Sequence, residues 1–142
     1  MTTIAFRDGV VASDTQCTDS GLPTYKKKLY PVRDSVVAIT GDVYACHKFL
    51  QWYSDKKQDK PDFPSDADFE CLIFTPSGLY GVDAHMTMVR FEPGEYCAFG
   101  SGRDAALGAM FMGASAVEAI EAAIRFDVNT GGSIDRFTVR GL

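Results

Sequence analysis

The sequence predicts an α+β fold in which two packed antiparallel sheets carry helices on their outer sides. Strand-like segments come first, one helix follows, then more strands, two helices and a last strand, without the regular β-α-β alternation of a parallel sheet. Turn residues divide the strands into short runs, as in antiparallel sheets. The 142 residues, 46% of them hydrophobic, suffice for a single domain, 1–142, with its own core.

Composition and charge exclude several classes of protein. The net charge of −5 opposes binding to the phosphates of nucleic acid. No apolar run approaches the about 20 residues of a membrane-spanning helix, and the first residues lack the pattern of a signal peptide. The four cysteines are too widely spaced for a zinc or dithiol motif, which favours reduced thiols in the core. We therefore expect a cytoplasmic protein that binds no metal, no cofactor, no nucleic acid and no membrane.

The N-terminal segment TTIAFRDGVVASD predicts a β-hairpin around Asp8-Gly9. A two-residue turn at this dipeptide would place Thr3 opposite Asp14, whereas a three-residue loop would place Thr2 there. Either register brings the carboxylate within a cross-strand spacing, about 5 Å between Cβ atoms, of the first two residues. We expect the three-residue register, with Asp14 directly opposite Thr2.

Strands and a helix follow the hairpin. Residues 15–25 are rich in Thr, Asp, Ser, Gly and Pro, which is typical of a loop. The segments KKKLYPV (26–32) and SVVAIT (35–40) are expected to be strands. Asp42 can cap the next helix, which we place at residues 42–58. Its apolar residues have the i, i+3, i+4 and i+7 spacing of one buried face: Cys46, Phe49, Leu50 and Tyr53.

The second half of the chain begins with a proline-containing break and continues with four short strands that predict an antiparallel sheet. Two helices come next, at residues 103–112 and from Ser115 onward, where Glu118 completes a capping box. The segment SIDRFTV, residues 133–139, is expected to be a final strand. The four short strands have the sequences FECLIFT, GLYGVD, TMVRF and EYCAF.

Thr2 is a candidate nucleophile. A small second residue permits removal of Met1, which would leave a free α-amine and a secondary hydroxyl on the same residue. An α-amine has a reference pKa of about 7.7–8.0, so part of it is neutral near neutral pH and can act as a base toward its own Oγ1. The β-methyl group restricts χ1 and helps to hold the hydroxyl in place.

Such a nucleophile needs a nearby cation that lowers the pKa of the amine, and an anion that holds the cation in place. The hairpin supplies Asp14 as the anion. The candidate cations are Lys26, Lys27 and Lys28. Strand alternation sends Lys26 and Lys28 to one face and Lys27 to the other, so we expect at least one lysine to point inward.

Six segments in order along the chain resemble the proteasome β subunits and their bacterial relative HslV, which are N-terminal nucleophile (Ntn) hydrolases: TTI, DGVVASD, KKL, VVAITG, FGSG and FDVNTGG. The resemblance covers nearly the whole chain. It implies a four-layer αββα sandwich and a threonine endopeptidase that uses a processed N-terminus. The family has two long helices where this chain has only residues 42–58, which implies that one helix layer is reduced.

The resemblance assigns roles to matching residues. Thr2 corresponds to the catalytic threonine, Asp14 to the aspartate that closes the first hairpin, and Lys28 to the catalytic lysine. Gly41 falls where the family uses a backbone N–H as the oxyanion donor.

Further matches lie in the second half of the chain. Ser101 corresponds to the serine that supports the N-terminal amine, and Asp127 and Thr130 to a supporting Asp-x-x-Ser pair in which threonine replaces serine. The same alignment places five residues around the pocket next to the scissile bond, which implies apolar or aromatic substrate side chains: Cys17, Tyr30, Ile39, Val43 and His47.

The resemblance also implies partners: an unfolded polypeptide or peptide substrate, further copies in a homo-oligomeric ring, and an ATPase unfoldase. Two other functions stay open. An inactive scaffold or ring subunit would retain Met1, and an Ntn amidase for a small molecule would form a small oligomer without an enclosed chamber. The segment FGSGRDA matches a dinucleotide-binding pattern, but no second parallel strand follows, so we set nucleotide binding aside.

Overall fold

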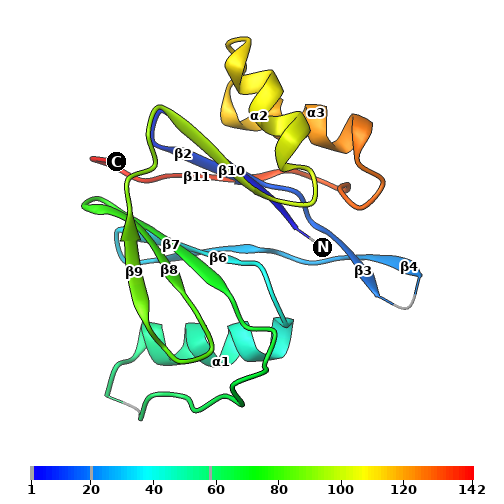
Figure 1. Ribbon diagram of the computed structural model, residues 1–142. Coiled ribbons are helices and arrows are strands. Elements are labelled where there is room, and N and C mark those ends of the chain that lie inside the picture. The colour runs from blue at the N-terminus through cyan, green and yellow to red at the C-terminus, as the bar shows by residue number, and fades with distance from the viewer. Residues whose placement is uncertain (1, 20, 58) are drawn as a thin grey trace.

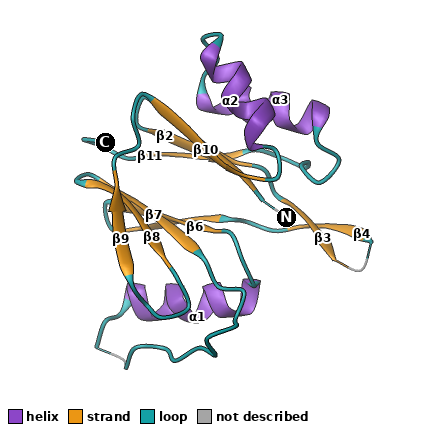
Figure 2. Ribbon diagram, in the orientation of Figure 1, coloured by secondary structure: helices purple, strands orange, loops and turns teal. Residues whose placement is uncertain are grey.

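The elements of the computed structural model form four layers (Figure 1). Helices α2 (Arg103–Phe111) and α3 (Ala116–Phe126) cover the outer face of one sheet. A second sheet packs against its inner face, and helix α1 (Val43–Ser54) covers the far side of that second sheet (Figure 2). This arrangement confirms the predicted α+β sandwich with one reduced helix layer. The structure describes residues 2–19, 21–57 and 59–142.

The first sheet is built around the N-terminal hairpin, whose side chains alternate between two environments. Ile4 and Phe6 pack toward the second sheet, while Ala5 and Ala12 pack against the outer helices. The small alanine side chains let the helices approach closely, and the larger side chains fill the space between the sheets. All neighbouring strands are antiparallel, in the order β10 (Tyr96–Gly100), β1 (Thr3–Arg7), β2 (Val10–Ser13) and β11 (Asp135–Thr138).

The register of the hairpin differs from the expected one. Asp8 and Gly9 form a two-residue turn, and both have positive φ angles, of 53° and 75°. These are the angles of a type I′ turn, whose twist matches that of the flanking strands. The prediction that Thr2 lies opposite Asp14 is therefore wrong, because the N–H of Asp14 donates instead to the carbonyl of Thr3, at 3.3 Å.

Residues 15–25, which we predicted to be a loop, contain a second hairpin. Strands β3 (Gln16–Asp19) and β4 (Leu22–Tyr25) pair with each other as a separate two-stranded ribbon. Every residue of β4 is exposed, so the segment lacks the alternation of apolar and polar residues that reveals a strand in a sequence. The ribbon projects from the sandwich beside the N-terminal end of the chain (Figure 1).

The second sheet is buried on both faces at its centre. Val36 and Ala38 face the first sheet, while Val37 and Ile39 belong to the apolar cluster under α1. Residues 36–39 are therefore an unbroken apolar run, as expected of a strand buried on both faces. The predicted strand at 26–32 begins only at residue 29, after the lysines. All neighbouring strands are antiparallel, in the order β5 (Leu29–Val32), β6 (Ser35–Ile39), β7 (Cys71–Thr75), β8 (Gly78–Val82) and β9 (Met88–Phe91).

The helices begin where the sequence predicts. The carboxylate of Asp42 caps α1 by accepting two backbone N–H groups of the first turn. Ser115 and Glu118 form the predicted capping box at the start of α3, at 3.1 and 3.0 Å. Helix α1 ends at Ser54, earlier than the predicted end at residue 58, which itself lies outside the described residues. In the described part of the chain, no helix has the length and apolar character needed to cross a bilayer.

Candidate active site

Thr2 lies immediately before β1. Its carbonyl oxygen accepts a hydrogen bond from the N–H of Ser101, at 3.1 Å. A Cβ atom on Gly100 would lie 1.6 Å from the same oxygen, and Gly100 has a φ angle of 100°, so only glycine fits there. The turn after β10 therefore holds the main chain of Thr2. Met1, whose removal the proposed chemistry requires, lies outside the described residues.

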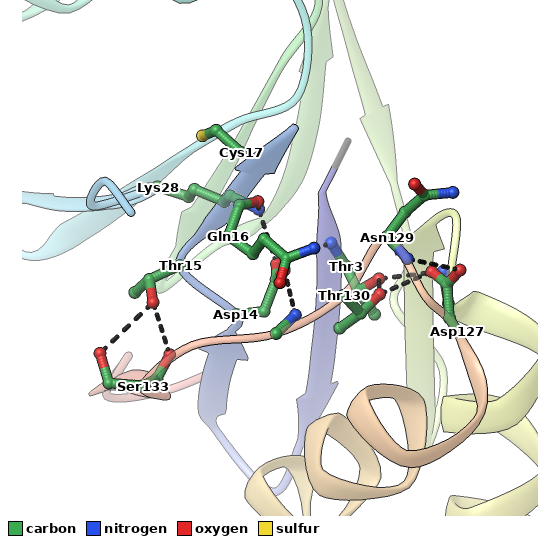
Figure 3. Close-up of polar contacts among 12 residues, drawn as sticks. Thr3, Asp14, Thr15, Gln16, Cys17, Lys28, Asp127, Asn129, Thr130 and Ser133 are labelled. Carbon is green, nitrogen blue, oxygen red and sulfur yellow. Dashed lines mark hydrogen bonds and ion pairs between the residues drawn. The ribbon is translucent and has the colours of Figure 1, made fainter. Parts of the chain in front are cut away.

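Asp14 and Lys28 form a buried ion pair close to the start of β1 (Figure 3). Nζ of Lys28 lies 2.8 Å from Oδ1 of Asp14, and the two side chains are only 3% and 0% exposed. Nζ also donates to the carbonyl of Gln16, at 2.5 Å. The carboxylate accepts the N–H groups of Thr3 and Gly131, both at 3.1 Å, which supplies the hydrogen bonds that a buried charge requires. The prediction that at least one lysine points inward is confirmed.

Thr3 is a candidate residue that sequence reasoning missed. Its side chain is completely buried, and its Oγ1 accepts the N–H of Gly102 at 2.9 Å. The same Oγ1 lies 2.8 Å from Oγ1 of Thr130, which donates to Oδ2 of Asp127 at 2.6 Å. Because the single hydroxyl hydrogen of Thr130 goes to the carboxylate, Thr3 is the donor to Thr130. A directed chain of hydrogen bonds thus runs from Gly102 through two hydroxyls to Asp127 (Figure 3).

Asp127 also accepts a hydrogen bond from Ser101, which joins Ser101 to the same series of hydrogen bonds. Partial burial acts to raise the pKa of Asp127, but hydrogen bonds from the hydroxyls of Thr130 and Ser101 and from the N–H of Asn129 outweigh it, so the pKa lies below its ordinary value. The Asn129 N–H reaches Oδ1 at 3.1 Å. The structure therefore brings together Ser101, Asp127 and Thr130 through hydrogen bonds to one carboxylate.

A cavity of about 340 Å³ borders Thr2, and Lys28 and Gly41 line it as well. Gly41 lies at the corner between β6 and α1, where a Cβ atom would come within 2.6 Å of the carbonyl oxygen of Asp68. A residue without a side chain is therefore required at this corner. The candidate nucleophile, the candidate oxyanion donor and the buried lysine consequently share one cavity.

Three of the five expected pocket residues line this cavity: Cys17, Ile39 and Val43. The other two, Tyr30 and His47, are not among its lining residues and contact each other instead, with the Tyr30 hydroxyl 3.4 Å from Nε2 of His47 and the rings edge to face.

A second cavity, of about 330 Å³, also borders Thr2. Its other lining residues include Thr40, Glu70, Ser101 and Arg103. Thr2 therefore borders two cavities that are otherwise lined by different residues.

Solved structures of other proteins share this fold over nearly the whole chain. The protein BPH of Thiobacillus denitrificans, in complex with epoxomicin, is 26% identical with a TM-score of 0.69, and the match covers 97% of this chain and 98% of that one. A further structure of the same BPH is 26% identical with a TM-score of 0.63 and 97% of each chain covered. Eukaryotic HslV from Trypanosoma brucei is 15% identical with a TM-score of 0.66, covering 96% of this chain and 97% of that one. No protein-family model and no curated protein matches the chain.

These neighbours are HslV- and proteasome-like peptidases. The layers, the strand order and the similarity over the full length define an Ntn-hydrolase fold of the αββα type. Within that class, the chain is similar to the threonine peptidase subunits of the HslV and proteasome kind, which confirms the resemblance inferred from the sequence.

Proposed function

We propose that the chain is a threonine peptidase subunit that hydrolyses peptide bonds through Thr2 once Met1 has been removed. The observation that carries this proposal is the cavity that Thr2 shares with Lys28 and Gly41. The buried ion pair between Lys28 and Asp14 and the fold shared with HslV-like peptidases support it further.

In the first step, Oγ1 of Thr2 attacks the carbonyl carbon of the substrate, and its proton passes to the α-amine of the same residue. The carbonyl oxygen takes the negative charge and accepts the N–H of Gly41. The amine then gives the proton to the leaving nitrogen as the C–N bond breaks, which leaves an ester on Thr2. Water hydrolyses this ester by the same proton path, releasing a carboxylic acid and restoring the hydroxyl.

The surrounding charges adapt the amine to this task. The buried ammonium group of Lys28 disfavours a second positive charge nearby, which favours the neutral form of the α-amine that can accept the proton. Asp14 holds Lys28 in position, at 2.8 Å. In this proposal Ser101 and Asp127 support the amine, as the resemblance implies. Thr3 is a positioning residue, because its hydroxyl connects the turn at Gly102 with the turn at Thr130.

We also infer that copies of the chain assemble in the cytoplasm into a homo-oligomeric ring that encloses the sites, and that an ATPase unfoldase supplies unfolded polypeptide. The fold shared with HslV supports this inference. Exposed apolar side chains near the ends of α2 and α3 offer surface for contacts between copies. They are Phe111, Met112, Phe126 and Val128, which are 76%, 82%, 79% and 89% exposed.

Variants at Thr2 test the proposed peptidase activity. Intact mass first establishes that Met1 is absent from protein made in cells, and a fluorogenic peptide then measures hydrolysis. Thr2→Ser keeps an amine and a hydroxyl on one residue and should retain activity. Thr2→Ala should lose at least about 1,000-fold in kcat, since loss of a covalent nucleophile has an effect of this size or larger. Complete retention of Met1 would overturn the proposal in favour of the inactive subunit. Full activity of Thr2→Ala would also overturn it, because hydrolysis would then use another residue as the nucleophile.

A further inference from the structure

The cavity that borders Thr2 has a cationic wall. Lys26 and Lys27 both line it, and both are exposed. Neither lysine forms an ion pair with any residue in the described part of the chain. These two consecutive residues line one cavity, and they lie between β4 and β5, outside any strand, so the alternation that we expected for the lysines does not apply.

The other charges on the described cavity wall already have partners. Lys28 is paired with Asp14. The carboxylate of Asp42 accepts the N–H groups of Tyr44 and Ala45, at 2.8 and 3.2 Å, at the positive end of the dipole of α1. Even if Asp42 counts as a full negative charge, the two exposed lysines leave the wall positive, in a protein whose net charge is −5.

The chemistry of attack determines which part of a substrate enters this cavity. When Thr2 attacks, the carbonyl oxygen of the substrate turns toward the N–H of Gly41, and both residues line the cavity. The side chain next to that carbonyl, on the acyl side of the scissile bond, therefore enters the same cavity. Its volume of about 340 Å³ accommodates such a side chain, and Ile39 and Val43 offer apolar contacts to methylene groups.

We propose that Lys26 and Lys27 select peptides that carry Asp or Glu on the acyl side of the scissile bond. Among the ordinary side chains of a peptide, the carboxylates of Asp and Glu are the anions that ammonium groups bind, and lysine binds them as a point charge without demanding one fixed geometry. The inference rests on the proposed role of Thr2, and it departs from the apolar or aromatic preference that the resemblance implied.

Two peptide epoxyketones that differ only in Glu or Gln at the reacting residue test this selectivity, because the two side chains have nearly the same shape and differ in charge. The rate of adduct formation on Thr2 is followed by intact mass in protein that lacks Met1. Wild type is compared with the double variant Lys26→Gln/Lys27→Gln. The matched control is Lys48→Gln/Lys57→Gln, which changes the net charge equally through two exposed lysines that do not line the cavity.

We expect the Glu compound to react about fivefold faster than the Gln compound, both in wild type and in the control. A ratio of about this size is expected because charge pairs that remain partly exposed contribute little binding energy. The ratio should fall to about 1 in the cavity variant, and it should shrink in wild type as added salt shortens the screening length. Because both lysines are exposed, the cavity variant should keep the wild-type melting temperature. The single variants Lys26→Gln and Lys27→Gln test the contribution of each lysine to the ratio of the two rates.

The outcomes separate this inference from the proposed function. Equal rates for the two compounds, with the adduct on Thr2, would overturn the selectivity and leave the peptidase proposal standing. A preference for Glu that persists in Lys26→Gln/Lys27→Gln would overturn the assignment to these lysines. No adduct with either compound would overturn the proposed function and the inference together.

Discussion

Two buried hydroxyls connect residues that lie far apart in the sequence. Thr3 and Thr130 are 127 positions apart, yet their Oγ1 atoms lie 2.8 Å from each other. The N–H of Gly102 begins this chain of hydrogen bonds and the carboxylate of Asp127 ends it. Each donor has one acceptor, so a change at one member affects the orientation of all the others.

Thr3→Val keeps the shape of the side chain and removes its hydroxyl. We expect the free energy of unfolding to fall by about 1–3 kcal/mol, because the buried N–H of Gly102 loses its acceptor. Thr3→Ser should restore most of this loss. If Thr3 positions the proposed site, Thr3→Val also lowers kcat and changes the pH profile of peptide hydrolysis, while Thr3→Ser keeps the wild-type profile. An unchanged profile in Thr3→Val would limit Thr3 to a structural role.

The lowered pKa of Asp127 predicts how the stability of the protein depends on pH. Its pKa is lowered in the folded protein, so its contribution to stability is complete above the unfolded pKa of about 3.9 and is lost as the pH falls through the lower folded value. The difference in Tm between wild type and Asp127→Asn should be constant at about pH 5 to 7 and shrink below about pH 4. A difference that stays constant into strong acid would contradict this account.

Among the elements, the turn between β10 and α2 has the tightest steric constraint at the site. Gly100 leaves no room for a side chain beside the carbonyl of Thr2, and a Cβ atom on Gly102 would lie 2.7 Å from Oγ1 of Thr3. These close approaches bring the N–H groups of Ser101 and Gly102 onto the first two residues of the described chain. The turn thereby positions the proposed nucleophile.

Gly100→Ala should therefore displace Thr2, with a loss of stability of about 2 kcal/mol or more and loss of peptide hydrolysis. Gly94→Ala is the matched control, because Gly94 also has a positive φ angle, of 67°, but a Cβ atom there would meet no other atom within 4 Å. Urea denaturation measures both variants. Equal losses in the two would show that backbone strain, and not the contact with Thr2, determines the effect.

The sequence predicts elements best where local chemistry decides them. Asp42 and the Ser115–Glu118 pair mark helix starts because a cap joins a side chain to a backbone group a few residues away. The hairpin of β3 and β4 was missed because its exposed residues carry no alternation. The register around Asp8-Gly9 was predicted wrongly because a functional expectation outweighed the turn chemistry, which favours two residues and would have identified Thr3.

The candidate site was less accessible to physical reasoning from the sequence. The predicted hairpin was enough to place Asp14 near the start of the chain, because Asp14 and the first residues belong to the same hairpin. Lys28, Ser101 and Asp127 meet there only through tertiary packing, so they entered by resemblance. The cationic wall of Lys26 and Lys27 depends on an irregular segment, for which the periodicity of a strand gives no guidance.

For the molecule as a whole, the site lies where several layers meet. In the described part of the chain, apolar clusters fill the space between the sheets and the space under the helices on both outer sides. The start of β1, the turn after β10 and the corner between β6 and α1 converge at the two cavities that border Thr2. The proposed site therefore requires the complete sandwich, and a partly folded chain would not form it.

Assembly gives a prediction at the same scale. If the chain forms a ring, size-exclusion chromatography with light scattering should give a mass several times that of the 15.5 kDa subunit. The apolar side chains exposed near the ends of α2 and α3 favour such contacts. A monomer would contradict the ring and favour an amidase that acts without an enclosed chamber.

The most direct test of the central claim is incubation with epoxomicin, the compound present in the complex of the similar protein BPH. A peptide epoxyketone needs a free amine and a nucleophilic hydroxyl on one residue, which is the arrangement proposed for Thr2. We predict a covalent adduct that peptide mapping locates on Thr2, in protein that has lost Met1, and that is absent from Thr2→Ala. Folded protein without Met1 that forms no adduct, or an adduct that persists in Thr2→Ala, would contradict the account.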